Sequence, residues 1–299
     1  MKIRPILGLL AALAAAPSAA QGADYEVAAR TDIQYVEHGG TKLAADLYAP
    51  KGLAKAPVLV TVHGGGWQNG NRATWKHLGP YLAKNGIAVF AISYRLGKAG
   101  TYPGEVYDVK SAIQFVRAKA NDLGVDPDRI GLMGASAGGH LVGLVGLAHE
   151  EFKSEYRDDP NANVPANVKA VVAFYGIYDM VAQWQHDQIQ RPRDQIAAKF
   201  LGALPSENRK LYFEASPMSY ATVAPNRPRF LLVHGTADDI VDPETQSIAF
   251  MTALNQAGIA VNRIVVPGAP HGWAGEPLDA DTYIGGVAPK VLRYLQGSL

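Results

Sequence analysis

The amino-acid sequence predicts a single α/β domain with a mostly parallel sheet of about eight strands and helices on both faces. Short runs of continuously apolar residues, typical of strands covered on both faces, alternate with longer amphipathic segments typical of helices. This alternation is characteristic of a doubly wound α/β domain. The 299 residues are enough for one such domain, and they contain no internal repeat.

The first twenty residues predict a secretory signal peptide. Lys2 and Arg4 precede an apolar run over 6–16, and small residues follow up to an expected cleavage site after Ala20. The apolar run is shorter than the about 20 residues that a membrane-spanning helix needs. We therefore expect residues 21–299 to form one mature domain that is secreted or periplasmic and has no membrane span.

Charge and cysteine content exclude several classes of function. There are 28 Lys and Arg against 27 Asp and Glu, so the chain has no basic excess that would indicate nucleic-acid binding. The absence of cysteine removes thiol nucleophiles, cysteine-ligated zinc and iron–sulfur clusters. The eight histidines show no metal-ligand spacing, and we expect neither a metal nor a cofactor.

The elements follow one another in a regular order. Partly alternating runs predict a hairpin over 31–50 that turns at Gly39-Gly40. Apolar runs predict strands, and these lie at 57–63, 87–95, 129–134, 168–176, 228–235 and 261–268. Amphipathic patterns predict helices, and these lie at 74–86, 105–124, 137–149, 243–258 and 287–297.

The segment 177–227 interrupts this order. It has no strand pattern, and its sequence is polar, rich in glutamine and interrupted by prolines. It is too long for a simple connection. We interpret it as a small helical insertion over the carboxyl edge of the sheet that acts as a lid or pocket wall, with surface decoration as the alternative.

A Gly-x-Ser-x-Gly pattern follows the strand expected at 129–134. It reads GASAG and places Ser136 between this strand and the next helix. A tight turn at such a place projects the serine hydroxyl from the edge of the sheet. Ser136 is therefore the candidate nucleophile, and a glycine-rich helix start is the alternative explanation.

A serine nucleophile needs a general base, and the base needs an orienting acid. The expected order along the chain is serine, acid, histidine. His271 fits the base because its loop follows the last strand, whereas His186 lies in the insertion and His234 ends a strand as a structural cap. Asp238 fits the acid because it comes first after the turn that follows the strand at 228–235.

Other carboxylates near these strand ends have alternative roles. Asp239 and Asp242 are interpreted as turn or helix-cap residues, and Asp242 directly precedes Pro243 at a helix start. Asp179, which follows the strand at 168–176, stays open as a second candidate for the acid.

The sequence HGGGW at 63–67 predicts an oxyanion site. Attack on an ester carbonyl leaves a negative oxygen, and each backbone N–H aimed at it contributes about 3 kcal/mol. We expect the N–H groups of Gly64, Gly65 and Ala137 to face this oxygen, with Gly66 letting the chain turn away. Which pair of the three glycines donates stays open.

Three tryptophans are candidates for contacts with substrate. Trp67 follows the glycines, Trp184 lies in the insertion and Trp273 follows the candidate base. Each is a plausible wall of an acyl or sugar pocket, and core packing is the alternative for each.

These motifs together resemble those of α/β-hydrolase esterases with an HGGG oxyanion loop, from about Tyr35 to the C-terminus. The chain is most similar to the branch of secreted carboxylesterases that includes acetyl xylan and feruloyl esterases, also through 93–95, 108–120 and 213–220. It departs from hormone-sensitive-lipase-like esterases, which have an acidic residue in place of Ala135 and a longer helical cap at the N-terminus.

The resemblance implies an α/β-hydrolase fold and a serine carboxylesterase that works through an acyl-enzyme. Its implied substrates are small-molecule or polysaccharide esters with short acyl, acetyl or feruloyl groups. An amide hydrolase of the arylformamidase or peptidase type is the alternative, because a catalytic triad serves both reactions. A binding module without catalysis fits less well, since every catalytic role has a candidate residue.

Overall fold

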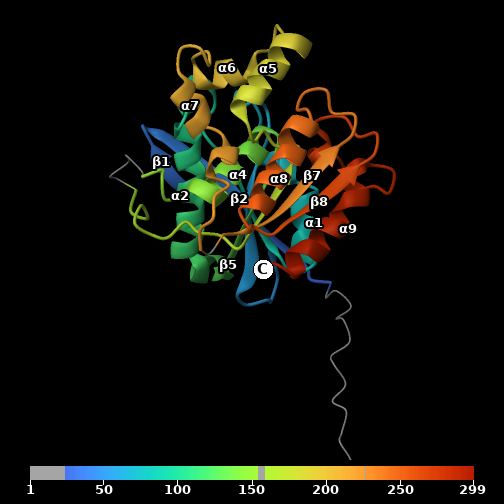
Figure 1. Cartoon of the computed structure of the whole chain (residues 1–299). Coiled ribbons are helices and arrows are strands. Elements are labelled where there is room, and N and C mark those ends of the chain that lie inside the picture. Colours follow the sequence, from blue (N-terminus) through green and yellow to red (C-terminus); the bar gives the residue numbers. More distant parts are fainter. Residues whose placement is uncertain (1–23, 154–158, 226) are drawn as a thin grey trace, which may run out of the picture.

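The computed structural model describes residues 24–153, 159–225 and 227–299, so the expected signal peptide at 1–20 lies outside the described residues. Within these residues, eight strands form one sheet that lies between layers of helices (Figure 1). The strand order is β1-β2-β4-β3-β5-β6-β7-β8, and all pairs from β4 to β8 are parallel. The predicted α/β-hydrolase architecture is confirmed.

The strands agree closely with the apolar runs. Their bounds are β1 Val27–His38, β2 Thr41–Pro50, β3 Ala56–Val62, β4 Ala88–Ile92, β5 Val125–Ala135, β6 Ala170–Phe174, β7 Arg229–Gly235 and β8 Val261–Val266. β1 and β2 form the predicted antiparallel hairpin, and β2 also pairs antiparallel with β4. The parallel strands end in register, with Val62 beside Gly134 and Gly235 beside Val266. The loops that follow them therefore meet at one edge.

The helices cover both faces of this sheet. Their bounds are α1 Leu78–Lys84, α2 Gly104–Ala118, α3 Ala120–Leu123, α4 Ala137–Ala148, α5 Met180–Gln190, α6 Ile196–Leu201, α7 Arg209–Glu214, α8 Ala249–Gln256 and α9 Tyr283–Gln296. Side chains alternate along each strand, so Val58 and Val60 share an apolar layer with α2 and α4, whereas Leu59 shares one with α1 and α9. No helix in the described ranges is both long and apolar enough to cross a bilayer.

The helix predicted at 74–86 is shorter than expected. A 3₁₀ turn at Arg72–Trp75 comes first, and α1 begins only at Leu78. Pro80 explains the break, because proline has no backbone N–H and is tolerated only in the first turn of a helix. The helix predicted at 105–124 is likewise divided into α2 and α3.

The insertion between β6 and β7 consists of α5, α6, α7 and a 3₁₀ turn at Pro217–Tyr220, above the sheet in Figure 1. α5 contacts the turn after β7 at two points. Gln183 donates from Nε2 to the carbonyl of Ile240 at 2.9 Å, and His186 Nε2 lies 2.9 Å from the carbonyl oxygen of Asp239. The expected helical content is confirmed, and the role as a lid or pocket wall stays a prediction.

Candidate active site

Ser136 lies in a tight turn between β5 and α4, with φ 56° and ψ −120°. A positive φ is uncommon for a residue other than glycine. The turn is held because the backbone N–H of Ser136 donates to the carbonyl of Phe174 at 2.9 Å. A Cβ at Gly138 would lie 2.1 Å from the carbonyl oxygen of Val62, so only glycine lets α4 approach β3 this closely. The strand, turn and helix predicted around Ser136 are present.

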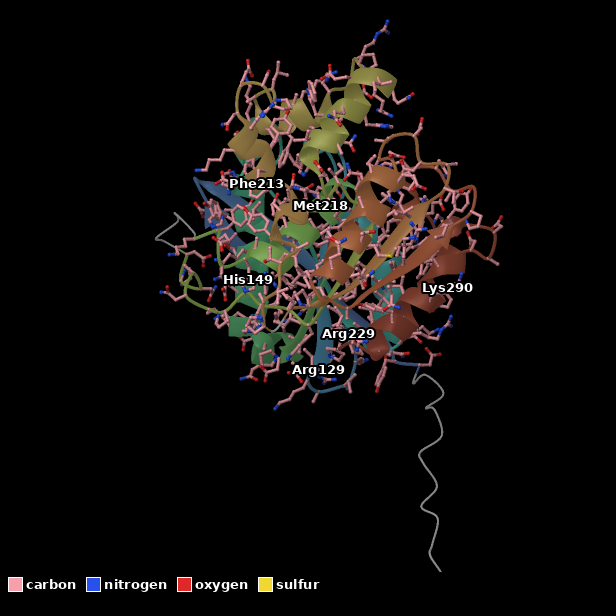
Figure 2. All side chains as sticks on the ribbon, in the orientation of Figure 1. Arg129, His149, Phe213, Met218, Arg229 and Lys290 are labelled. Atoms are coloured by element: carbon pink, nitrogen blue, oxygen red, sulfur yellow. The ribbon has the colours of Figure 1, made fainter. Side chains whose placement is uncertain are left out.

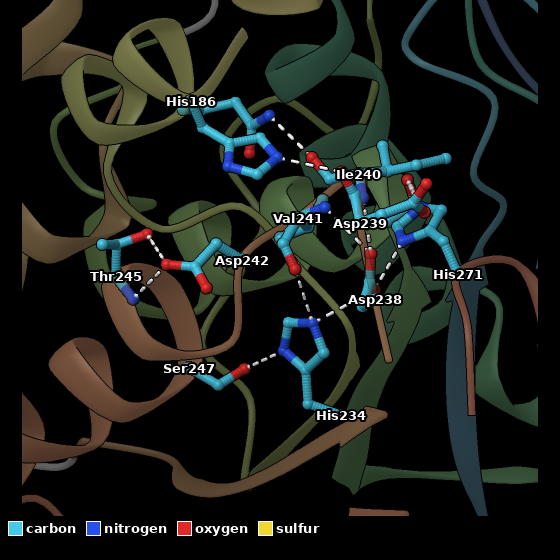
Figure 3. A network of polar contacts seen from close by, with 12 residues as sticks. His186, His234, Asp238, Asp239, Ile240, Val241, Asp242, Thr245, Ser247 and His271 are labelled. Atoms are coloured by element: carbon cyan, nitrogen blue, oxygen red, sulfur yellow. Dashed lines mark hydrogen bonds and ion pairs between the residues drawn. The ribbon is translucent and has the colours of Figure 1, made fainter. Parts of the chain in front are cut away.

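His271 contacts Asp238 on one side of its ring (Figure 3) and Ser136 on the other. Its Nε2 is 2.8 Å from Ser136 Oγ, and its Nδ1 is 2.7 Å from Asp238 Oδ2. Asp238 follows β7 and His271 follows β8, which are adjacent parallel strands. The sheet therefore brings together three side chains that are 33 and 135 residues apart in the sequence.

The carboxylate of Asp238 is buried and accepts four hydrogen bonds. Its Oδ1 accepts from the N–H groups of Ile240 at 3.0 Å and Val241 at 2.9 Å. Its Oδ2 faces His271 at 2.7 Å and His234 at 3.1 Å. Burial alone raises the pKa of Asp238, but hydrogen bonds from both histidines, the charge of the His271 ring and the backbone N–H hold that pKa well below its usual range. Asp238 is therefore ionised at neutral pH.

The other carboxylates considered for this role are occupied elsewhere. Asp179 caps α5, where its Oδ1 accepts from the N–H groups of Val181 at 2.8 Å and Ala182 at 3.0 Å. Asp242 is the predicted cap, and its Oδ2 accepts from the N–H of Thr245 at 3.0 Å. Each carboxylate therefore stabilises a helix start.

Gly64 lies directly beside the serine turn, and the exposed Gly65 follows it in the same loop. A Cβ at Gly64 would be 2.9 Å from the carbonyl oxygen of Ala135 and 3.1 Å from Ser136 Cβ. Across the described part of the chain, neither Gly64 nor Gly65 donates a backbone hydrogen bond to another residue. Ala137 is the first residue of α4, where a backbone N–H has no acceptor within its helix. Gly64 and Ala137 therefore lie next to Ser136, and the role of Gly64, Gly65 and Ala137 in binding an oxyanion stays a prediction.

His63, the first residue of the HGGGW sequence, shapes this loop from inside the protein. Its Nδ1 is 2.7 Å from the carbonyl oxygen of Gly64, and its ring stacks on Tyr94 with centroids 4.3 Å apart. Burial lowers the pKa of His63 to about 4, although its bond to Gly64 opposes the shift. The ring is therefore neutral at pH 7 and donates from Nδ1 to the carbonyl that follows it.

Two of the three tryptophans predicted to contact substrate are core residues, so that prediction is wrong for them. Trp67 is 0% exposed, stacks on Phe200 at 4.1 Å and donates from Nε1 to His140 at 3.2 Å. Trp273 is 1% exposed and packs edge-on against Phe174. Both follow chain reversals that turn the large ring inward, where burial of its apolar surface is favourable.

Trp184 lines a cavity of about 820 Å³ in the insertion, between α5, α7 and the turn at 217–220. Its apolar lining includes Val181, Trp184, Pro205, Tyr212, Phe213 and Met218, and its polar lining includes Asp179, Gln185 and Arg209. Figure 2 shows Phe213 and Met218 on the same side of the molecule. Neither Ser136 nor His271 lines this cavity, and contact of Trp184 with substrate stays a prediction.

Two residues at the site have contacts that were not predicted from the sequence. Tyr175 directly follows β6, and its ring centroid lies 4.6 Å from that of His271. Its hydroxyl accepts from the N–H of Ala274 at 2.8 Å and so holds the loop that carries the histidine. His234 ends its strand as expected, but it also contacts Asp238. The signal that could have found both is their position at the carboxyl ends of strands beside the acid and the base.

The chain is similar in sequence to several proteins that are named as esterases or ester hydrolases. The model of the BD-FAE family matches residues 45–254. Esterase LipQ of Mycobacterium tuberculosis (strain ATCC 25618 / H37Rv) is 33% identical over 251 residues, which cover 81% of this chain and 57% of LipQ. The chain thus spans only about half the length of the curated relatives it matches.

Solved esterase structures have the same fold. The butyrate-bound esterase Est2 of Thermogutta terrifontis has a TM-score of 0.73 and 25% identity, and the match covers 93% of this chain and 95% of Est2. A bifunctional GH43-CE protein of Bacteroides eggerthii has a TM-score of 0.75 and 28% identity over 90% of this chain and 38% of that protein. The family model matches residues 45–254, which is more than half of the 299 residues, so the chain belongs to the BD-FAE family.

Proposed function

We propose that the chain is a serine carboxylic-ester hydrolase that acts through an acyl-enzyme. The observation that carries this proposal is the continuous series of hydrogen bonds from Ser136 Oγ through His271 to Asp238, at 2.8 and 2.7 Å. A serine nucleophile, its general base and its orienting acid need this arrangement. The names of the relatives, esterase among them, support the same class of reaction.

In the first half of the reaction, Ser136 Oγ attacks the ester carbonyl carbon while His271 Nε2 takes the hydroxyl proton. Asp238 accepts the Nδ1–H of His271, so Nε2 presents its lone pair to the serine. The carbonyl oxygen becomes negative. When the C–O bond breaks, His271 returns the proton to the leaving alcohol.

The negative oxygen is held by the backbone N–H groups of Gly64, Gly65 and Ala137. The close approach of Gly64 to the serine turn supports this role, because donors that are fixed before the substrate arrives stabilise a developing negative charge most strongly. Water then attacks the acyl carbon, gives its proton to His271 and releases the acid, and the proton returns to Ser136.

We propose that the substrates are small-molecule or carbohydrate-linked esters with short acyl, acetyl or feruloyl groups. The Thermogutta terrifontis neighbour is described with butyrate bound, and another neighbour is described as a carbohydrate esterase from gut microbiota. Trp184 and Phe213 give the cavity in the insertion flat apolar surfaces of the kind that stack on sugar and phenyl rings.

We also propose that the chain is exported and cleaved after Ala20, which leaves a secreted or periplasmic enzyme. Expression of the full chain in a Gram-negative host tests this. The periplasmic or medium fraction should contain a protein whose N-terminal sequence begins at Gln21. Recovery of the uncleaved chain from the cytoplasm would contradict the proposal.

Covalent labelling tests the reaction itself. A fluorophosphonate should label the purified protein once, and peptide mapping should place the adduct on Ser136. Ser136→Ala should abolish both labelling and ester hydrolysis. A rate panel of short p-nitrophenyl esters, acetylated xylan, methyl ferulate, an N-formyl arylamine and a peptide anilide then separates ester from amide specificity. A preference for the amides would overturn the proposed substrate class.

A further inference from the structure

His234 lies behind the acid of the proposed triad and is 2% exposed. Its Nε2 is 3.1 Å from Asp238 Oδ2 and 3.0 Å from the carbonyl oxygen of Val241. Its Nδ1 is hydrogen-bonded to the hydroxyl of Ser247 in the segment Glu244–Ile248 that precedes α8 (Figure 3). The ring therefore contacts three polar groups inside the protein, and one of them is the carboxylate that serves His271.

These partners determine where the ring of His234 carries its proton. Nε2 faces a carboxylate oxygen and a carbonyl oxygen, and neither can donate a hydrogen bond at neutral pH. Nε2 must therefore carry a hydrogen and donate it. The hydroxyl of Ser247 can donate to Nδ1, so a neutral ring has all its polar atoms satisfied.

Asp238 Oδ2 is thus shared by two imidazole rings, His271 at 2.7 Å and His234 at 3.1 Å. We propose that His234 is a positioning residue that withdraws part of the negative charge of Asp238 from His271 and thereby sets the pH range in which His271 acts as a base. This inference rests on the proposed ester hydrolysis at Ser136.

Three other titratable groups near the two rings, Tyr175, His186 and Asp242, have partners of their own. Tyr175 lies against both rings, and burial raises its pKa far above the usual value, with Asp238 and Glu276 adding to the shift and the N–H of Ala274 opposing it. Its phenol is therefore neutral. On the solvent side, His186 contacts a backbone carbonyl and Asp242 caps a helix. Asp238 is the carboxylate in direct contact with both rings.

The direction of the effect follows from charge. A donor at Asp238 Oδ2 reduces the negative potential that acts on His271. If this donor is lost, the carboxylate holds the protonated form of His271 more strongly. His271 must be neutral to take the serine proton, so the acid limb of the kcat/KM profile should then move to higher pH.

Two amide substitutions separate this role from simple packing. In His234→Gln the side-chain NH₂ can occupy the place of Nε2 and still donate to Asp238, whereas in His234→Asn the shorter amide reaches only the place of Nδ1. We expect His234→Asn to move the midpoint of the acid limb upward by roughly 0.5–1 pH unit. We expect His234→Gln to stay close to the wild-type midpoint.

The measurement is the pH dependence of kcat/KM for a short p-nitrophenyl ester, with the thermal midpoint of each variant recorded at each pH. Ser247→Ala serves as a third variant, because it disturbs the same ring but leaves the Nε2 donor in place. It should lower the thermal midpoint without moving the acid limb.

The outcomes distinguish the inference from the proposed function. If His234→Asn and His234→Gln both keep the wild-type midpoint, or move it equally, His234 is only structural and the inference fails. If His234→Asn moves the midpoint to lower pH, the proposed direction of charge is wrong. If Ser136→Ala keeps full activity, the proposed function itself fails, whatever the His234 variants do.

Discussion

The strand ends that carry the proposed triad and the insertion above them are built in opposite ways. The side chain of Asp238 is fully buried and holds four donors, and His271 is fixed between it and Ser136. On the insertion, Phe213 is 62% exposed and Ile189 is 76% exposed. The sheet therefore fixes the reacting groups, while the insertion leaves apolar side chains free to contact another molecule.

The insertion owes its structure to the side chains it turns inward. α6 and α7 have six residues each, which is too short for a helix to persist alone in water. Ala197, Phe200 and Tyr212 bury their side chains in the core below and hold these helices in place. Outward-facing residues of the insertion can therefore change with little effect on the fold, so the two regions should respond differently to substitution.

Substitution of the acid should have the largest effect. In Asp238→Asn the amide can present N–H instead of oxygen to His271 Nδ1, which favours the wrong tautomer, so kcat should fall by about 10⁴-fold. The control is Asp239→Asn, because Asp239 is the next residue in the chain and its side chain is exposed. Steady-state kinetics on a short ester check both variants, and a loss below tenfold in Asp238→Asn would remove Asp238 from the proposed triad.

A methyl group in the oxyanion loop should have the next largest effect. In Gly64→Ala the new Cβ would press on the serine turn, 2.9 Å from the carbonyl oxygen of Ala135. The loop must then shift, and misplacing one oxyanion donor lowers kcat by roughly 10²–10³-fold. Gly66→Ala is the matched comparison, because its Cβ would enter open space and meet only the strain of a positive φ. Equal losses of kcat in both variants would contradict the assignment of Gly64.

These two variants concern positions that could be predicted from the sequence, and the reason is local. A few neighbouring residues are enough to encode each apolar strand, the turn at Ser136 and the loop at Gly64. The parallel arrangement then requires the loops after β3, β5, β7 and β8 to meet at one edge. His271 and Asp238 follow from this edge together with the order of the motifs.

Packing between distant segments could not be predicted in this way. The burial of Trp67 depends on Phe200, which is far along the chain in the insertion. The contact of His234 with Asp238 depends on the exact conformation of the turn at 238–241, which no sequence pattern predicts. A tryptophan beside a catalytic motif thus has the same local sequence whether it lines a pocket or fills the core.

A buried carboxyl group at the start of α2 should make the free energy of unfolding depend on pH. Burial raises the pKa of Glu105 to about 9. The hydrogen bond from the backbone N–H of Glu105 and the charge of Arg95 oppose this shift, whereas the charge of Asp108 adds to it. A carboxyl whose pKa is raised by folding stabilises the fold fully below its unfolded value, about 4.5, and this contribution is lost as the pH rises toward 9.

Glu105→Gln removes this titration. The variant should match the wild type near pH 4 and exceed it by about 1–3 kcal/mol in free energy of unfolding near pH 8.5. Urea unfolding at the two pH values measures the difference. Glu207→Gln, on an exposed position of the insertion, should show no such dependence. A Glu105→Gln variant that is less stable than wild type at pH 8.5 would contradict this prediction.

The smallest effect should come from the insertion, and it should appear in KM rather than in kcat. Phe213 lines the cavity and is mostly exposed, so Phe213→Ala should leave the thermal midpoint and the hydrolysis of p-nitrophenyl acetate nearly unchanged. If the cavity holds the sugar or aryl part of the substrate, loss of one aromatic contact worth about 0.5–1 kcal/mol raises KM for acetylated xylan or methyl ferulate two- to fivefold.

Ile189→Ala is the matched control for this variant, because Ile189 is also exposed on the insertion but does not line the cavity. An equal change of KM in both variants would mean that the insertion acts on substrate only through its general surface. A fall in kcat for p-nitrophenyl acetate in Phe213→Ala alone would mean that the insertion reaches the reacting groups. Either result would contradict the view that the sheet fixes the reacting groups while the insertion selects the substrate.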